Sequence, residues 1–239
     1  MKILIKGSLG VNGIAQVTMN YCEKLKNENS YEFVVCETPK LIRKDFIEIC
    51  NNNGWKIHYM PSQVTSIIRY KRALKNIFKS YKPDIYHING NSCLMCIDVL
   101  LAKKYVKNII THCHSTSTKF PVLNKLLKPM LKKQKILRLA CSKEAALWAY
   151  GNSECILLRN AIDYNRFKYS EIIRTTKRKE LHLRNDELVI LQVGNFEYEK
   201  NQIYSIKLFE MICKKNKNIK MVFCGEGEDR YSIKKYVEN

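Results

Sequence analysis

The chain has 239 residues, ten cysteines and a formal net charge of +20, and its length allows one large domain or two small ones. No apolar run approaches the roughly 18 residues that span a bilayer, and the start, MKILIKGSLG, lacks the apolar length and cleavage site of a signal peptide. The cysteines are expected to be free thiols in a reducing cytoplasm. The charge is spread along a chain rich in Lys, Asn and Ile, without a zinc-finger or other nucleic-acid motif, so nucleic acid is not an expected partner.

Short apolar runs alternate with amphipathic stretches over the first two thirds of the chain. Strands are expected at residues 2–6, 31–36, 55–60, 84–88, 108–113, 136–141 and 154–158. Helices are expected between them, at residues 13–27, 40–52, 63–80, 91–105, 121–133 and 143–150. This alternation predicts a doubly wound α/β domain, in which helices cover both faces of a parallel sheet.

A polar, charged stretch without a strand signal follows, at residues 163–186, and it is expected to carry a short helix. The alternation then restarts with a strand at 187–193, a helix at 201–214, a strand at 219–224 and a helix at 230–237. We therefore place a first domain at 1–165, a linker at 166–186 and a partial second domain at 187–239.

Ligands of open α/β sheets bind beyond the carboxyl ends of the strands, so the residues that follow each strand are the candidates for a site. After the first strand comes GSLGVNG, whose three glycines allow a ligand close to the backbone, with a helix N-terminus behind them. The order differs from the dinucleotide pattern G-x-G-x-x-G. Glu37, just beyond the second strand, leaves a nicotinamide enzyme as a minor alternative.

Histidines follow two neighbouring strands. HINGN contains His87 and Asn89 after the fourth strand, and THCHSTST contains His112 and His114 after the fifth. Two histidines at a strand end, before a loop of hydroxyl side chains, indicate either a site or a structural pair, and the two interpretations stay open.

Cys93 and Cys96, with Cys113 and His114 further on, resemble part of a zinc site. The spacing lacks a second matching half, and the two cysteines lie on an expected apolar helix face. No metal site is therefore expected.

The stretch FPVLNKLLKPMLKKQKILR, residues 120–138, repeats leucines at helical spacing among Lys125, Lys128, Lys132 and Lys133. Pro129 predicts two short helices or one kinked helix. The segment packs on its own domain or rests on anionic lipid headgroups, so a peripheral contact at the inner face of the membrane stays open.

Glycines follow both strands of the second unit, Gly194 after the first and Gly225-Glu226-Gly227 after the second. Lys200 lies six residues beyond Gly194, at the start of the following helix. Backbone N–H groups, a helix dipole and an ammonium group together predict a diphosphate site.

Taken together, these stretches resemble the family 4 glycosyltransferases of the GT-B fold, in the branch that builds bacterial capsular or exopolysaccharide. The matching pieces occur in the family's order: VNGIAQVTMNY, DIYHINGNS, THCHSTS, ACSKEA, LLRNAIDYNRF, QVGNFEYEKNQ and FCGEGEDR. The resemblance implies two Rossmann-like domains, with the acceptor on the first and a nucleotide-sugar mainly on the second. It also implies retaining transfer to a lipid-linked saccharide, without a metal or another cofactor.

The resemblance assigns roles to individual residues. Lys200 matches the lysine on the donor diphosphate, and His114 matches the histidine that faces the donor sugar, which makes it the catalytic candidate. Asn195 stands in place of an arginine and brings hydrogen bonds without a positive charge, while Asn12 and Gly13 stand where a glycine pair is usual. The expected donor contacts are Gly13, Asn195, Lys200, Gly225 and Glu226, and the expected acceptor-side residues are Asn12, Asn89 and His112.

The family's paired glutamates, which hold the donor sugar and its ribose, would lie beyond residue 239. The resemblance therefore predicts a truncated glycosyltransferase or a fragment of one, and we expect this chain alone not to transfer sugar. Two alternatives stay open. One is a nucleotide-sugar epimerase, which shares the architecture although the order of motifs favours transfer. The other is a non-catalytic subunit that binds the acceptor while a partner supplies the donor site.

Overall fold

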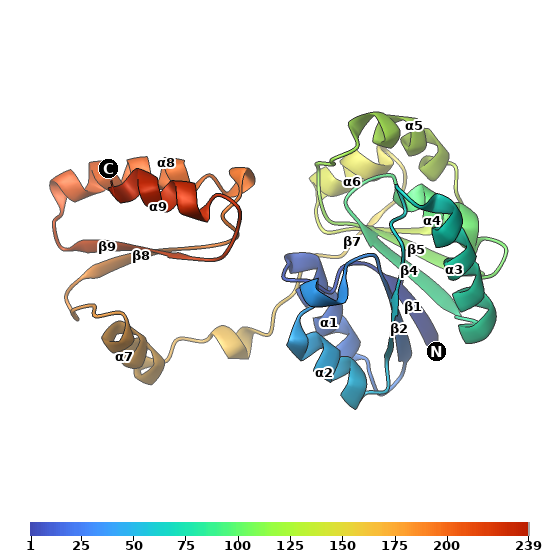
Figure 1. The fold of residues 1–239 in the computed structure, drawn as a ribbon, viewed down its shortest axis with the longest axis horizontal. Helices are drawn as coiled ribbons and strands as arrows, with labels where there is room; N and C mark the ends of the chain where they lie inside the picture. The colour runs from blue at the N-terminus through green and yellow to red at the C-terminus, as the bar shows by residue number, and fades with distance from the viewer. Residues whose placement is uncertain (239) are drawn as a thin grey trace. The chain divides into compact units, whose positions relative to one another are not determined.

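A computed structural model describes residues 1–238 and divides the chain into two compact units, unit 1 from Met1 to Tyr164 and unit 2 from Asn165 onward (Figure 1). Unit 1 is built on a seven-stranded sheet in the order β3-β2-β1-β4-β5-β6-β7, in which every neighbouring pair is parallel. The strands are β1 (Lys2–Lys6), β2 (Ser30–Val35), β3 (Lys56–Tyr59), β4 (Ile85–Gly90), β5 (Asn108–Cys113), β6 (Leu137–Ala140) and β7 (Ile156–Leu157).

Helices cover both faces of this sheet, which confirms the predicted doubly wound arrangement (Figure 1). Successive strand residues point to opposite faces, so Ile5 joins one core, with Phe33 and Trp55, while Leu4 joins the other, with Tyr86. The first core is covered by α1 (Gly13–Lys24) and α2 (Lys44–Asn52), and the second by α3 (Ile67–Tyr81), α4 (Met95–Ala102), α5 (Pro121–Lys132) and α6 (Lys143–Tyr150).

The prediction of one helix over 40–52 is wrong. A short 3-10 turn, η1 (Pro39–Leu41), precedes α2, and the backbone between them is extended at Ile42 and Arg43. Ile42 forms an antiparallel bridge with Gly10, and the Arg43 N–H donates to the Leu9 carbonyl at 3.1 Å. Backbone hydrogen bonds to the glycine loop therefore replace those of a continuous helix at this point.

Other elements also differ from the sequence expectation, among them the helix expected at 63–80, which begins only at Ile67. The helix expected at 91–105 begins only at Met95, because the Cys93 N–H donates at 2.7 Å to the side-chain oxygen of Asn124. The strand expected at 154–158 is the two-residue β7. The helix α5 is continuous, with Pro129 inside it, so the alternative of two short helices is wrong.

Unit 2 contains two strand–helix pairs, as predicted. The strands β8 (Leu188–Val193) and β9 (Ile219–Cys224) pair in parallel, and α8 (Gln202–Lys215) and α9 (Arg230–Glu238) lie on one face of them (Figure 1). Before them come η2 (Tyr164–Phe167) and α7 (Glu171–Glu180), and η3 (Tyr198–Lys200) precedes α8.

The chain segments that follow β8 and β9 approach so closely that glycine is required. A Cβ atom on Gly225 would lie 1.9 Å from the Gly194 carbonyl oxygen, and one on Gly227 would lie 2.3 Å from the Phe196 carbonyl oxygen. Both obstructing atoms belong to the backbone, so a side chain cannot turn away to make room. The two glycines thus allow the close approach, and backbone hydrogen bonds from Gly194 to Cys224 and from Phe196 to Glu226 hold the two segments together.

Gly225→Ala should lower the free energy of unfolding by at least about 2 kcal/mol, because the backbone at Gly194 must move. Gly13→Ala is the matched control, since a Cβ atom there meets nothing within 4 Å and alanine favours the first turn of α1. Urea unfolding and limited proteolysis measure the difference, with cleavage of the Gly225 variant expected beyond residue 165. Equal stability of the two variants would contradict this account of the strand ends.

Candidate functional site

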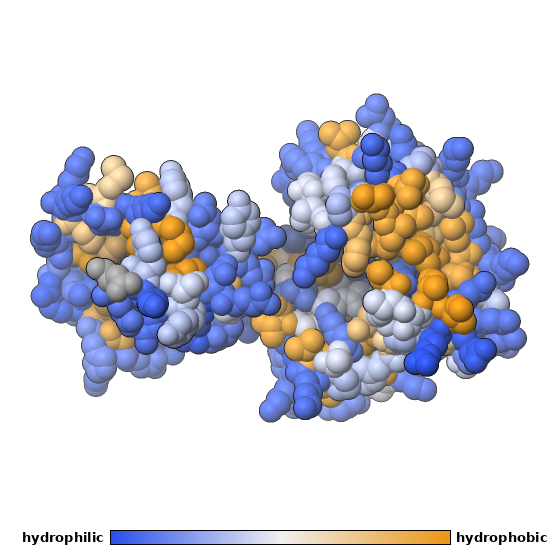
Figure 2. Space-filling view, turned by 45° about the horizontal axis from the view of Figure 1, so that its top comes forward, coloured by the Kyte–Doolittle hydropathy of each residue, from blue (hydrophilic) through white to orange (hydrophobic). Residues whose placement is uncertain are grey.

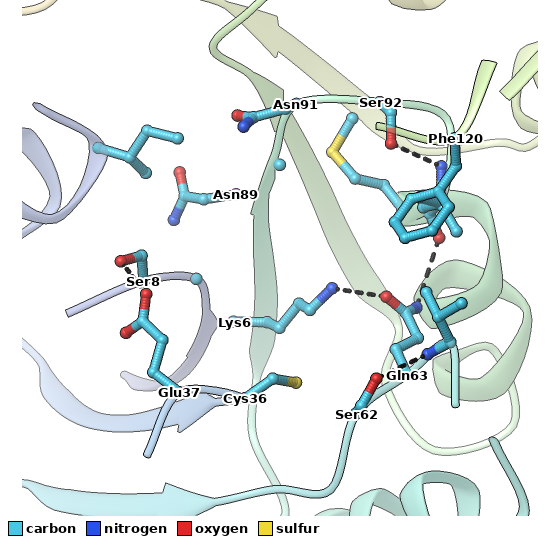
Figure 3. A pocket seen from close by; sticks show the side chains of 16 residues that line it. Lys6, Ser8, Cys36, Glu37, Ser62, Gln63, Asn89, Asn91, Ser92 and Phe120 are labelled. Carbon is cyan, nitrogen blue, oxygen red and sulfur yellow. Dashed lines mark hydrogen bonds between the residues drawn. The ribbon is translucent and has the colours of Figure 1, made fainter. Parts of the chain in front are cut away.

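A pocket of about 340 Å³ lies in unit 1 beyond the carboxyl ends of β1 and β4 (Figure 3). This is the position where open parallel sheets bind ligands. The wall combines polar side chains with apolar ones, including an aromatic ring at one side, and the residues used below are Lys6, Ser8, Glu37, Gln63, Asn89 and Phe120.

A buried carboxylate, Asp98 on α4, fixes one wall of the pocket. Its Oδ2 accepts from the Lys6 ammonium at 2.9 Å and from the Gln63 amide at 2.7 Å, while its Oδ1 accepts from the hydroxyls of Tyr70 and Tyr86. Asp98 is fully buried. Burial and, to a smaller extent, the Asp98 charge raise the pKa of each tyrosine well above the ordinary value of a phenol, so both hydroxyls stay protonated and donate. The Lys6 charge is thereby compensated inside the protein.

A second carboxylate, Glu37, holds the glycine loop. It accepts from the Ser8 hydroxyl and, at 3.0 Å, from the Leu9 N–H. Asn12 caps α1, because its carbonyl oxygen accepts from the Ala15 N–H at 3.0 Å while its amide donates to the Ser8 hydroxyl oxygen. The side chain of Asn12 is therefore occupied in forming the loop that borders the pocket.

Three histidine rings lie together, one from the middle of β4 (His87) and two from the carboxyl end of β5 and the residue after it (His112 and His114). The ring centroids of His112 and His114 are 3.9 Å apart, and those of His87 and His112 are 5.7 Å apart. His114 Nε2 is 2.9 Å from Asn89 Oδ1, and since an amide oxygen only accepts, we assign the proton to Nε2. His114 thus reaches the pocket wall through Asn89.

Burial keeps these histidines neutral near pH 7. It lowers the pKa of His112 to about 4, and burial together with the neighbouring histidines lowers the pKa of His87 and of His114 to about 3. Four covered polar atoms in the cluster lack a hydrogen-bond partner: Asn89 Nδ2, His87 Nε2, His112 Nε2 and His114 Nδ1. His112 is only 2% exposed, so it supports the site from behind and does not present its ring to a ligand.

The residues expected to bind the donor gather at the strand ends of unit 2, except Gly13, which opens α1 in unit 1. The Lys200 stem packs over Gly194, with its Cδ 3.4 Å from the point where a Cβ atom would stand. The Asn195 amide donates to Glu197 at 3.2 Å, and the Asn195 carbonyl accepts from Gln202 at 2.7 Å. Glu226, beside Gly225, forms an exposed ion pair with Arg230 at 2.7 Å.

Cys93, Cys96 and Cys113, which resemble part of a zinc site in the sequence, are buried and do not line the pocket. Burial raises the pKa of Cys93 to about 11 and that of Cys113 to about 12, so both are protonated thiols near pH 7. Within residues 1–238, no group of three His, Cys, Asp or Glu side chains is placed to hold a metal ion. Over the same residues, no helix combines the length and the apolar character needed to cross a membrane.

Sequence reasoning missed Lys6, Gln63 and Asp98. A signal for two of them was present, because Lys6 ends an apolar strand and Asp98 is the single charged residue of the apolar helix MCIDVLLA. A lone charge in an apolar element indicates a buried partner. Gln63 carries no such signal, since it lies in the polar loop that follows β3.

Two Rossmann-like units, each with polar groups at the carboxyl ends of its parallel strands, define the GT-B class of fold. A family model described as Glycosyltransferase Family 4 matches residues 11–151, and a second, described as Glycosyl transferases group 1, matches residues 173–239. Because the first match covers more than half of the chain, this chain belongs to glycosyltransferase family 4.

A curated relative, the capsular polysaccharide biosynthesis glycosyltransferase CapH of Staphylococcus aureus, is 25% identical over 224 residues. The match covers 91% of this chain and 59% of CapH. Among solved structures, Anabaena HepE in complex with UDP and glucose has a TM-score of 0.74 at 14% identity, over 100% of this chain and 65% of HepE. The UDP-GlcNAc 2-epimerase of Neisseria meningitidis, bound to UDP-GlcNAc, has a TM-score of 0.58 at 13% identity, over 93% of this chain and 65% of the epimerase. These two structures show the fold alone.

The histidine cluster predicts that acid destabilises unit 1. An unfolded histidine takes up a proton below about pH 6.5, whereas His112 resists it down to about 4. Stability is therefore complete above pH 6.5 and is lost as the pH falls toward 4, by about 2 kcal/mol for one such histidine at pH 5. Thermal unfolding at several pH values measures this loss.

His112→Asn should show a smaller loss of stability between about pH 7.5 and about pH 5 than the unmodified chain. His182→Asn is the control, because His182 is exposed and its left-handed backbone, with φ of 54°, is one that asparagine tolerates. An identical pH profile for the unmodified chain and the His112 variant would show that His112 does not titrate on unfolding.

Proposed function

We propose that this chain serves retaining transfer of a sugar from a nucleotide-sugar donor to a lipid-linked saccharide in capsular or exopolysaccharide synthesis. Membership of glycosyltransferase family 4 and the capsular role in the name of CapH support this proposal. The chain spans 59% of CapH and 65% of HepE, so the proposal concerns the two partial sites that its own residues form. Epimerase structures share only the fold, and the family favours transfer.

The arrangement around Lys200 carries the proposal. Lys200, the glycine contact between Gly194 and Gly225, and the first turn of α8 all lie beyond the carboxyl ends of β8 and β9. The residue before α8, Asn201, makes no side-chain cap, so the first N–H groups of the helix are left for another acceptor. An exposed ammonium beside a helix N-terminus suits a diphosphate.

Transfer leaves negative charge on the departing nucleoside diphosphate. In this proposal Lys200 offsets the charge directly, and the helix N–H groups stabilise it through hydrogen bonds. Asn195 adds a neutral donor, which stabilises the leaving group less than a guanidinium would. No metal is assigned to this step. His114, which the resemblance places toward the donor sugar, is neutral near pH 7 and donates a hydrogen bond from Nε2 to Asn89, so in this proposal it acts by positioning Asn89.

The pocket of unit 1 is assigned to the acceptor. Asn89 lines it directly, His114 stands behind Asn89, and His112 supports His114. The loop capped by Asn12 borders the pocket on the side of β1. This assignment also suits the alternative of a subunit that binds only the acceptor, and the donor measurement below separates the two.

A surface of unit 1 is suited to hold the chain at a membrane that carries the acceptor. Figure 2 shows apolar side chains gathered on one face of this unit. Separately, the helix α5 exposes Val122 (73%), Leu126 (64%) and Met130 (44%). Lys125 and Lys133 are exposed on or next to the same helix. By contrast, the Lys128 ammonium donates to the Leu147 carbonyl of α6 at 3.2 Å, so it is engaged within the protein.

Lys200→Ala should weaken UDP binding by roughly 10- to 150-fold, the loss of about 1.5–3 kcal/mol expected for a charge-assisted hydrogen bond. Lys207→Ala, an exposed lysine further along α8, should leave the affinity unchanged. Isothermal titration calorimetry with UDP measures both. Equal affinities for the two variants would remove Lys200 from the donor site, and no UDP binding by the unmodified chain would favour the acceptor-only subunit.

Lys125→Gln and Lys133→Gln should each weaken binding to phosphatidylglycerol vesicles by about 1 kcal/mol, and Leu126→Ser should weaken it further. Ile172→Ser, which changes a still more exposed apolar residue on α7 (81%), is the control and should have no effect. Vesicle sedimentation at two salt concentrations measures binding. Equal sedimentation with neutral and acidic vesicles would refute the proposed membrane contact.

A further inference from the structure

The pocket of unit 1 has the size and composition for a single sugar unit. Its volume of about 340 Å³ lies near the lower end of the range for ligand pockets, about 300–1,000 Å³. Apolar surface comes from Ile14, Val64, Leu94, Met95 and Phe120, and the other residues of the wall add hydroxyl, amide and charged groups. A sugar ring offers both kinds of surface, since its C–H groups are apolar and its hydroxyls donate and accept hydrogen bonds.

The only lysine in this wall is not available to pair with an anion. Lys6 Nζ is 2.9 Å from Asp98 and 3.0 Å from the Gln63 side-chain oxygen. Asp98 is fully buried and holds three further hydrogen bonds, so it keeps the ammonium in place. A phosphate or carboxylate would have to compete with this ion pair for Lys6.

The carboxylate of Glu37, in contrast, has no cationic partner. None of the ion pairs among residues 1–238 includes Glu37, and its recorded donors are the Ser8 hydroxyl and the Leu9 N–H. The charged groups at the pocket, Lys6, Asp98 and Glu37, therefore leave a net negative charge. Such a wall accepts hydrogen bonds from hydroxyls and repels anions.

Asn89 directs an unused donor toward this pocket wall. Asn89 is only 4% exposed, and its side-chain oxygen accepts from His114. Its Nδ2 is also covered, but it has no hydrogen-bond partner. A buried donor without an acceptor destabilises the protein, and a ligand oxygen that accepts from this donor removes the penalty. Ser92, also in the wall, accepts from the Leu94 N–H through its hydroxyl oxygen, and no hydrogen bond among the described residues uses its own proton.

We propose that this pocket binds the terminal unit of the acceptor as an uncharged hexose or N-acetylhexosamine, and that Glu37 discriminates against sugars that carry a carboxylate or a phosphate. The assignment to an acceptor rests on the proposed function, whereas the preference for a neutral sugar rests on the wall itself. Asn89 Nδ2 and the Ser92 hydroxyl donate to sugar oxygens, Glu37 accepts from a sugar hydroxyl, and Phe120 covers an apolar ring face.

Saturation-transfer NMR on the 239-residue chain tests this preference with sugar pairs that differ only at C6. The pairs are the methyl glycosides of glucose and glucuronic acid and of galactose and galacturonic acid, with N-acetylglucosamine as an additional neutral probe. At least one neutral sugar should bind at least about tenfold more tightly than its acidic counterpart. Glu37→Gln should bring the two members of that pair toward equal affinity, while Glu48→Gln, an exposed change on α2, should leave the ratio unchanged.

A second variant locates the binding without altering the loop that Glu37 holds. Phe120→Ala should reduce binding of the neutral sugar at least about fivefold, whereas Phe167→Ala, an exposed aromatic of η2, should not. Acidic sugars that bind as well as neutral ones, or neutral binding that Phe120→Ala leaves intact, would overturn the proposal. UDP is titrated into the same samples. UDP binding without sugar binding refutes only this subsite, and sugar binding without UDP binding refutes only the donor site.

Discussion

The buried carboxylate of Asp98 is the group on which the pocket of unit 1 depends. It joins α4 to β1 through Lys6, to the loop after β3 through Gln63, and to α3 and β4 through two tyrosines. A buried charge is tolerated only when it is paired and fully hydrogen-bonded, and four donors meet that condition here. One interaction thereby sets both the position of the pocket wall and the absence of a free positive charge in it.

The candidate sites of the two units differ in how their charged groups are paired. The whole chain carries a net charge of +20, yet the pocket of unit 1 is lined by a compensated lysine and by a glutamate without a cationic partner, and the three histidines near Asn89 are kept neutral by burial. At the strand ends of unit 2, Lys200 is exposed, and none of the ion pairs among residues 1–238 includes it. The first candidate site is therefore better suited to hydroxyl groups and the second to phosphates, although each lies at the carboxyl edge of the parallel sheet of its own unit.

Local patterns explain how much of this could be predicted. The alternation of apolar runs predicted both units, because strand and helix periods are properties of neighbouring residues. It was wrong at Ile42, where a bridge to Gly10 replaces helical hydrogen bonds, and at residues 91–94, where Asn124 captures the Cys93 N–H. In each case the competing partner lies more than 25 residues away, so no window of local sequence contains it.

By itself, the sequence determined the fold class, the family and the strand ends at which the candidate sites lie, since these follow from the order of motifs and the position of each motif after a strand. Only the tertiary structure decided which polar groups are used up and which remain free. Lys6 and Asp98 are 92 residues apart, and Asn89 gives its oxygen to His114 but leaves its amide unpaired. The pairing of a buried polar group depends on which distant elements pack against it, and spacing along the chain carries no record of that packing.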